Sequence, residues 1–148
     1  MWISTRGQYG LRALVELARE TKPLAIKEIA ERQGISGAYL EQILALLRRA
    51  GYIKSTRGAF GGYALSKAPN QITTLEVILT LEGSLAPVAC VEDSSNCAHV
   101  NACGTESLWR RLDATVTSIL TSCTVADLLE EAEFKDAVQV MKRQSLSL

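Results

Sequence analysis

The chain has 148 residues, 47% of them hydrophobic, and its 16 basic residues balance its 16 acidic residues. This composition indicates a globular domain with its own core, and it excludes a disordered or uniformly basic chain. No apolar run approaches the roughly 18 residues of a membrane span, and the start, MWISTRGQYG, lacks the apolar segment of a signal peptide. We therefore expect a cytoplasmic protein with no membrane partner.

The first third of the chain predicts three helices. Residues 6–20 and 26–33 carry apolar side chains at helical spacing, the first set being Leu11, Leu14, Val15 and Ala18. Gly34 permits a tight bend, and Ser36 is a good N-cap for a helix over 37–50. That third helix carries a single apolar stripe, made of Leu40, Ile43, Leu44 and Leu47. Two helices joined by a short glycine-containing turn are typical of a helix-turn-helix.

The next segment changes from helical to strand character. Residues 52–55 and 62–65 predict short strands, and the loop TRGAFG between them contains two glycines. Such a hairpin after a helix-turn-helix predicts a wing. The stretch 36–67 has five basic residues against one acid, a net charge of +4, whereas 130–136 has a net charge of −3. A local positive patch on a neutral protein indicates either a phosphate-binding surface or an ordinary solvated face.

The helix over 37–50, the second helix of the helix-turn-helix, would present its polar face to DNA. A major groove admits one helix, whose N-terminal side chains reach base edges. Gln42 could pair with adenine and Glu41 could accept a hydrogen bond from cytosine. The wing tip at Arg57 and Gly58 could enter a minor groove or bind phosphate. With Ser36 and Ala38 these residues form the expected DNA-binding set, and a helical hairpin with a plain surface is the alternative.

The middle of the chain holds a long polar loop. Thr73 and Glu76 form a capping box for a helix that ends near Gly83. The loop over 84–104 then runs without periodicity, and loops of about 20 residues are uncommon unless they are functional. It carries three cysteines with the spacing C-x6-C-x5-C, namely Cys90, Cys97 and Cys103.

These three cysteines suit a metal or an iron–sulfur cluster. The cytosol keeps thiols reduced, and thiolates bind zinc and iron–sulfur clusters. Zinc sites usually have closer cysteine pairs, so the wider spacing favours a cluster. Glu106, on the opening turn of the next helix, is the expected fourth ligand, and His99 is the local alternative. Unliganded loop thiols are the remaining interpretation.

A long helix is expected over 105–122, with a near-heptad apolar stripe that makes it a candidate subunit interface. The stripe comprises Leu108, Leu112, Val116, Ile119 and Cys123, of which the cysteine is expected to be a small buried hydrophobe. Thr124 and Asp127 can cap a last short helix. The expected units are a winged helix-turn-helix over 1–83, a cysteine loop over 84–104, a dimerisation helix with a short helix over 105–136, and a tail over 137–148. No catalytic motif is present, and one histidine disfavours an acyl-transfer triad, so no enzyme is expected.

Several segments together resemble a known family, the Rrf-type winged-helix transcription regulators, over nearly all of residues 3–133. They are STRGQYGLRALVELA, the block IAERQGIS-x-x-YLEQILALLRRAGYIKSTRGAFGGYALSK, TTLEVILTLEG, the three cysteines, and SLWRRLDATV leading to TVADLL. The resemblance implies a mainly α fold with a two-stranded wing and a homodimer joined by the long helix. It also implies binding to a pseudo-palindromic operator in double-stranded DNA. By position, it assigns recognition to Ser36, Tyr39, Glu41 and Gln42, and the wing arginine to Arg57.

The resemblance further implies that the cysteines hold an iron–sulfur cluster, and we expect [2Fe-2S] rather than [4Fe-4S]. The fourth ligand varies within the family. Some members have a histidine where this chain has Glu106, and others use an aspartate near the N-terminus where this chain has Gln8. The expected function is a transcription regulator that senses redox state, iron or a reactive gas. The alternatives are cysteines that bind zinc or act as a thiol–disulfide switch, and an interaction module or small electron carrier that does not touch DNA.

Overall fold

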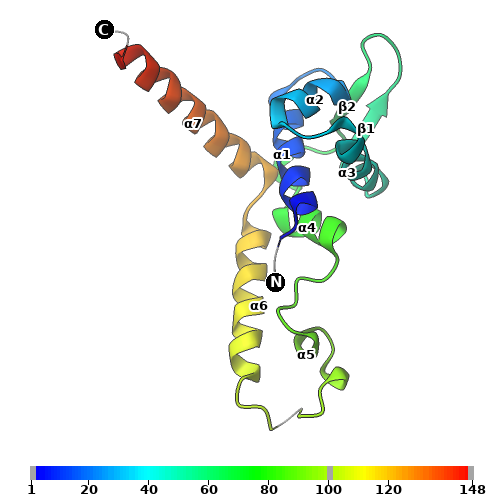
Figure 1. Ribbon diagram of the computed structural model, residues 1–148, viewed down its shortest axis with the longest axis vertical. Coiled ribbons are helices and arrows are strands. Elements are labelled where there is room, and N and C mark those ends of the chain that lie inside the picture. The colour runs from blue at the N-terminus through cyan, green and yellow to red at the C-terminus, as the bar shows by residue number, and fades with distance from the viewer. Residues whose placement is uncertain (1–2, 100–101, 147–148) are drawn as a thin grey trace.

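The computed structural model describes residues 3–99 and 102–146. Its elements, in chain order, are α1 (Thr5–Arg19), α2 (Ile26–Gln33), α3 (Gly37–Arg49), β1 (Ile53–Thr56), β2 (Gly62–Leu65), a 3-10 turn (Pro69–Gln71), α4 (Thr74–Glu82), α5 (Ala89–Glu92), a second 3-10 turn (Ser94–Asn96), α6 (Glu106–Ser122) and α7 (Val125–Leu146). Helices α1 to α4 and the wing gather in one head, from which α6 and α7 extend in different directions (Figure 1). Helix α5 lies beside the far end of α6, away from the wing. This confirms the predicted mainly α fold with a two-stranded wing.

The core of the head forms where α1, α3 and α4 meet. The predicted stripe of α3 is fully buried at all four positions, Leu40, Ile43, Leu44 and Leu47. Helix α1 differs from the prediction, because Leu14 is buried but Leu11 and Val15 are only half-buried. Its buried face instead includes Gly10, where a Cβ atom would overlap the Leu81 side chain of α4. Since α1 packs on α4 on one side and on α7 on the other, its apolar residues are divided between two faces.

The turn between α2 and α3 has the geometry that the sequence predicted. Gly34 adopts a left-handed conformation with φ of 64°, which side chains other than glycine rarely tolerate. Ser36 then caps α3, since its Oγ accepts a hydrogen bond from the Tyr39 N–H at 3.3 Å. The helix-turn-helix is therefore present, and the N-terminal turn of α3 faces outward.

The wing is a rigid hairpin at its base. Strands β1 and β2 pair antiparallel, with register from Ile53 opposite Leu65 to Thr56 opposite Gly62. Strand β2 is also held from its other side, because Tyr63 and Leu24 exchange two backbone hydrogen bonds of 2.8 and 2.9 Å. Compared with the prediction, β1 begins and ends one residue later. The wing base is thus fixed on both edges of β2, and only the tip over 57–61 projects.

The last helix is longer than the sequence predicted. Instead of a short helix followed by a tail over 137–148, α7 continues to Leu146. The described part of this segment contains no glycine or proline after Val125, and it is rich in good helix formers. An i,i+4 ion pair between Lys135 and Glu131, at 2.6 Å, favours the helix slightly. Over the described residues, no helix is both long enough and apolar enough to cross a membrane.

The cap at the start of α7 is the predicted one and should depend on pH. Both the N–H and the hydroxyl of Thr124 donate to the Asp127 carboxylate at 2.7 Å, and these bonds hold the pKa of Asp127 below its ordinary value. A carboxylate whose pKa is lowered by folding stabilises the fold above its ordinary pKa. That contribution is lost as the pH falls through the lowered value.

We therefore expect Asp127→Asn to lower the melting temperature at pH 7. Asparagine keeps an acceptor oxygen, so the difference isolates the charge. The difference from the wild-type melting temperature should shrink as the pH falls below about 3.9. Circular dichroism melts from pH 7 to pH 3 measure this, and a difference independent of pH would contradict the assignment.

Candidate functional site

Helix α3 and the wing tip present exposed side chains on the same end of the head. Six of the residues predicted to contact DNA are exposed there: Ser36, Ala38, Glu41, Gln42, Arg57 and Gly58. Tyr39 differs, because it is half-buried and its hydroxyl lies 3.1 Å from Thr5 Oγ1. Its ring packs edge-on against Tyr9, with 6.0 Å between ring centroids. Tyr39 therefore fixes α3 against α1, while the other six residues are accessible to a ligand.

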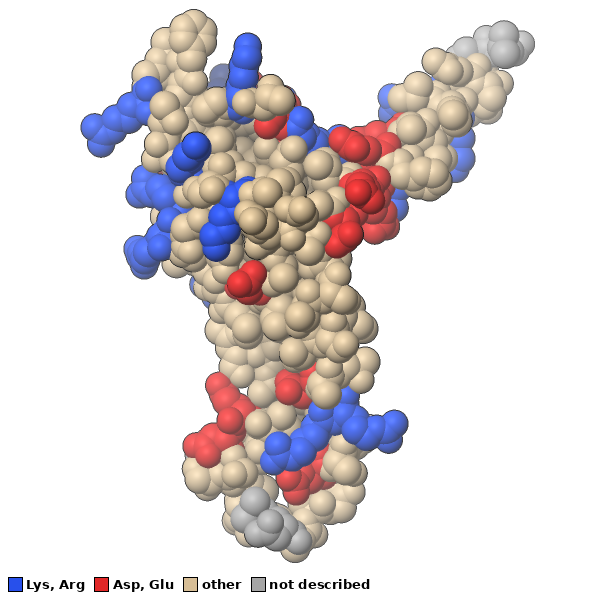
Figure 2. All heavy atoms as spheres, turned by 180° about the vertical axis from the view of Figure 1, so that it is seen from behind, with Lys and Arg blue, Asp and Glu red and all other residues tan. Residues whose placement is uncertain are grey.

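The charge pattern of the surface agrees with that arrangement. The five basic residues of the predicted patch are all exposed: Arg48, Arg49, Lys54, Arg57 and Lys67. Figure 2 shows Lys and Arg gathered over the α3 and wing side of the head, and Asp and Glu gathered where α7 leaves it. Arg48 Nη1 donates to Ser55 Oγ at 3.2 Å, which ties the end of α3 to the wing. Positive charge is thus concentrated where a polyanion would meet the helix and the wing together.

The segment predicted as an unstructured loop is partly ordered. It contains helix α5 and a 3-10 turn, whose first residues are held by a hydrogen bond from Ser95 N–H to Asp93 Oδ1 at 2.9 Å. Cys90 lies on α5, and Cys97 directly follows the 3-10 turn. Local backbone hydrogen bonds, rather than side-chain periodicity, form these short elements, so the sequence pattern did not show them.

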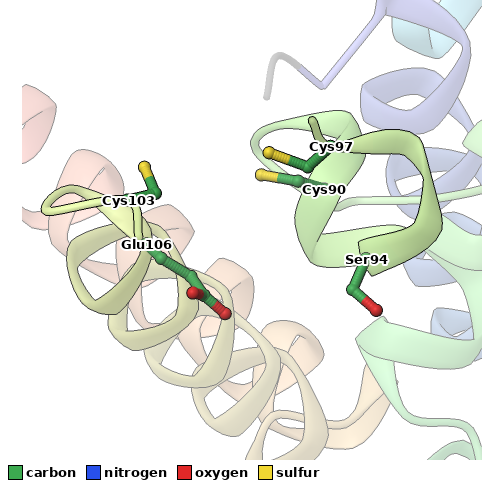
Figure 3. A pocket seen from close by; sticks show the side chains of 5 residues that line it. All are labelled: Cys90, Ser94, Cys97, Cys103 and Glu106. Carbon is green, nitrogen blue, oxygen red and sulfur yellow. The ribbon is translucent and has the colours of Figure 1, made fainter. Parts of the chain in front are cut away.

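Three cysteines and a carboxylate line one pocket. Its walls are Cys90, Ser94, Cys97, Cys103 and Glu106, and the cysteines and the glutamate are all half-buried. Figure 3 shows the sulfur atoms of Cys90 and Cys97 pointing the same way, toward Cys103, which precedes α6, and Glu106, which begins it. The four predicted ligands therefore approach one another from two facing segments.

Of the candidate fourth ligands, the structure places Glu106 beside the cysteines. Gln8 lies on α1, donates from Nε2 to the Ile3 carbonyl at 3.1 Å, and lines a groove between α1 and α7 instead. His99 is exposed and is not among the residues that line the cysteine pocket. Within residues 3–99 and 102–146, no three Cys, His, Asp or Glu side chains come close enough to hold one metal ion together.

The side chains that line the pocket are of the kinds that bind metals and iron–sulfur clusters. Hydrogen bonding from Thr105, whose Oγ1 lies 3.2 Å from Cys103 Sγ, lowers the pKa of the Cys103 thiol and favours the thiolate that binds metals. Glu106 Oε1 accepts a hydrogen bond from Arg110 Nε at 2.7 Å, which orients the carboxylate. Three thiols and one carboxylate supply up to four ligands, the number that holds a [2Fe-2S] or a [4Fe-4S] cluster.

Helix α6 leaves most of its apolar stripe in solvent, and Val116 is half-buried. Leu108, Leu112 and Ile119 are 54%, 41% and 60% exposed, and no described residue of α6 is buried. Cys123, expected to be buried, is half-buried after the end of α6, and that burial raises the pKa of its thiol. An uncovered apolar stripe on a long helix is what a subunit interface requires.

Two residues were not predicted, one at the wing tip and one outside both sites. Phe60 stands at the wing tip with 94% of its surface exposed, and the only signal for it was an aromatic residue in a glycine-containing loop. Glu82, at the end of α4, accepts hydrogen bonds from Ser4 and Gly7 at the start of α1. That contact joins residues 75 to 78 positions apart, and no local pattern encodes it.

Comparison with known proteins supports the DNA-binding part of the site. A family model, Rrf2, described as an iron-dependent transcriptional regulator, matches residues 3–131. The regulator CymR of Bacillus subtilis is 40% identical over 141 residues, covering 94% of this chain and 95% of the relative. The regulator IscR of Klebsiella pneumoniae (strain 342) is 36% identical over 138 residues, covering 92% and 84%.

The fold is shared as well. A solved structure of CymR, described as the global cysteine regulator of B. subtilis, matches this chain with a TM-score of 0.75 at 39% identity, covering 88% of this chain and 98% of that one. The head, the wing and the extended helices are therefore those of DNA-binding regulators. The chain belongs to the Rrf2 family of winged-helix transcriptional regulators.

Proposed function

We propose that this regulator is a homodimer that binds operator DNA and responds to the state of an iron–sulfur cluster. One observation carries the sensing part: Cys90, Cys97, Cys103 and Glu106 line a single pocket and approach it from two segments. The description of the family as iron-dependent supports it. A regulator of this kind acts on chromosomal DNA in the cytoplasm.

In this proposal Cys90 and Cys97 would hold one side of the cluster, and Cys103 and Glu106 the other. When bound, the cluster supplies a centre that redox agents and reactive gases can alter. A carboxylate binds iron less tightly than a thiolate does, so Glu106 would be the weakest of the four proposed ligands. Loss of the cluster would remove the link between the α5 segment and the start of α6, and the end of the interface helix would then gain freedom to move.

The DNA-binding part places α3 in the major groove and the wing beside it. Ser36, Ala38, Glu41 and Gln42 are the side chains proposed to face base edges, and Arg57 and Gly58 the wing residues proposed to meet the minor groove. In a dimer joined by α6, a shift at the start of α6 changes the spacing of the two α3 helices. Two spacings that bind the operator with different affinity are sufficient for regulation.

A thiol–disulfide switch is the alternative function. It is favoured by Cys90 and Cys97, whose sulfur atoms point the same way from one short segment. Their two thiols would form one disulfide, with two electrons and two protons reducing hydrogen peroxide to water. A zinc site would need its donors around one ion, an arrangement that the described residues do not adopt.

The test is the colour and metal content of protein purified without oxygen. The proposal predicts brown protein with visible absorbance and with acid-labile sulfide equimolar to iron. Zinc content and titrated free thiols are measured on the same sample. Colourless protein that stays colourless after reconstitution, with all thiols free and reversible loss of two thiols on oxidation, would establish the alternative and overturn the cluster.

A further inference from the structure

The tip of the wing presents one aromatic ring to solvent. Phe60 is 94% exposed, more than any other large hydrophobic side chain in the described part of the chain. A single exposed apolar residue is ordinary on a protein surface. This ring, however, lies in the same five-residue tip as Arg57, on the end of the head where the positive charge gathers.

The backbone holds this ring in a defined place. The tip closes through a hydrogen bond from the Gly61 N–H to the Gly58 carbonyl at 3.0 Å. Gly58 has φ of 112°, a conformation that favours glycine, and a Cβ atom on Gly61 would overlap the Thr56 carbonyl. The tip is therefore a tight turn on a fixed hairpin, and it presents Phe60 outward without a flexible linker.

A minor groove is the surface that this combination fits. Cationic side chains are attracted to its negative potential, and apolar side chains such as phenylalanine enter it as wedges that partly unstack a base step. We infer that Phe60 is such a wedge, entering the minor groove next to Arg57 at a flexible pyrimidine–purine step. The inference rests on the proposed contact of the wing with DNA, and it adds a sequence preference read through deformability instead of through base edges.

The experiment starts from DNA selected by the protein itself. Full-length wild-type protein and the Phe60→Ala variant each select duplexes from a random-sequence library. The wild type should enrich a TA or CA/TG step at the position of the wing. The variant should lose that enrichment and keep the base preferences read by α3.

Affinity for the duplex selected by the wild type is then measured by fluorescence anisotropy at several salt concentrations. Phe60→Ala should weaken binding about tenfold at every salt concentration, because it removes an apolar contact and no phosphate contact. Arg57→Ala should instead weaken binding and reduce the salt slope by about one. Phe60→Trp should bind like the wild type, and so should the matched control Ala59→Ser. Because the Phe60 ring is exposed, Phe60→Ala should have the melting temperature of the wild type.

Two outcomes would overturn the inference. In the first, Phe60→Ala binds DNA within twofold of the wild type and selects the same step, while Arg57→Ala and Gln42→Ala bind more weakly. The insertion of Phe60 would then be wrong, and the proposed DNA-binding surface would still be supported. If none of the three variants changes binding, the proposed DNA-binding surface fails and the wedge fails with it.

Discussion

Alanine at Cys90, Cys97 or Cys103 should each abolish the visible absorbance of protein purified without oxygen. Each thiol lines the pocket, and thiolates are the strong ligands of an iron–sulfur cluster, so replacing one of the three by a methyl group should prevent the cluster from being retained. The matched control is Cys123→Ala, because Cys123 is the remaining cysteine of the chain and is not among the residues that line the pocket. That variant should keep full absorbance and an unchanged ratio of sulfide to iron.

The fourth ligand can be identified in the same experiment. Glu106→Ala should load less iron or lose it faster in air, because it removes the carboxylate at the start of α6. Gln8→Ala and His99→Ala should load like the wild type, since neither side chain lines the pocket. Full loading of Glu106→Ala together with loss in Gln8→Ala would move the fourth ligand to α1 and contradict our assignment. Since the ligand side chains are only half-buried, circular dichroism should show that every variant folds.

The sequence predicted the elements whose pattern is local. The stripe of α3 was correct because Leu40, Ile43, Leu44 and Leu47 face one continuous core. The stripe of α1 was only partly correct, because packing on α4 and α7 divides its apolar side chains between two faces. The C-terminal half of α7 was missed because it extends from the head and buries no side chain, so tertiary contact imposes no apolar periodicity on it.

The candidate site divides in the same way. Spacing marked the cysteines and the capped start of α3, since both are features of short stretches of sequence. Spacing favoured Glu106 over His99 and Gln8, but it could not show which of them lies beside the cysteines, because that depends on how the chain returns from α5 to the start of α6. It also could not show the Thr5–Tyr39 contact or the Glu82 contacts, which join helices far apart in the sequence.

Replacing Glu82 by alanine should lower the free energy of unfolding by about 2 kcal/mol. Glu82 Oε1 accepts three hydrogen bonds at the start of α1, from Ser4 N at 3.2 Å, Ser4 Oγ at 2.6 Å and Gly7 N at 2.9 Å. Its negative charge also lies at the positive end of the helix dipole. Urea unfolding measures the loss, and a change below about 0.5 kcal/mol would contradict it.

Glu82→Gln is the control that separates the hydrogen bonds from the charge. All three donors meet one oxygen, and the carbonyl oxygen of glutamine can accept the same bonds, so this variant should lose only the smaller dipole contribution. Exposed Glu92, on α5, offers a second control, since Glu92→Ala removes an acidic side chain outside the head.

The same carboxylate should also affect DNA binding, although it lies outside the DNA-binding face. Glu82 ends α4, the helix that leads into the cysteine segment, and it anchors the first turn of α1. Thr5, which follows Ser4 and begins α1, contacts Tyr39 of α3. Glu82→Ala should therefore weaken the packing of α3 against α1 and lower the affinity for operator DNA in protein that is still folded. Glu82→Gln should restore both stability and affinity. A folded Glu82→Ala variant with wild-type affinity would mean that α1 does not position α3.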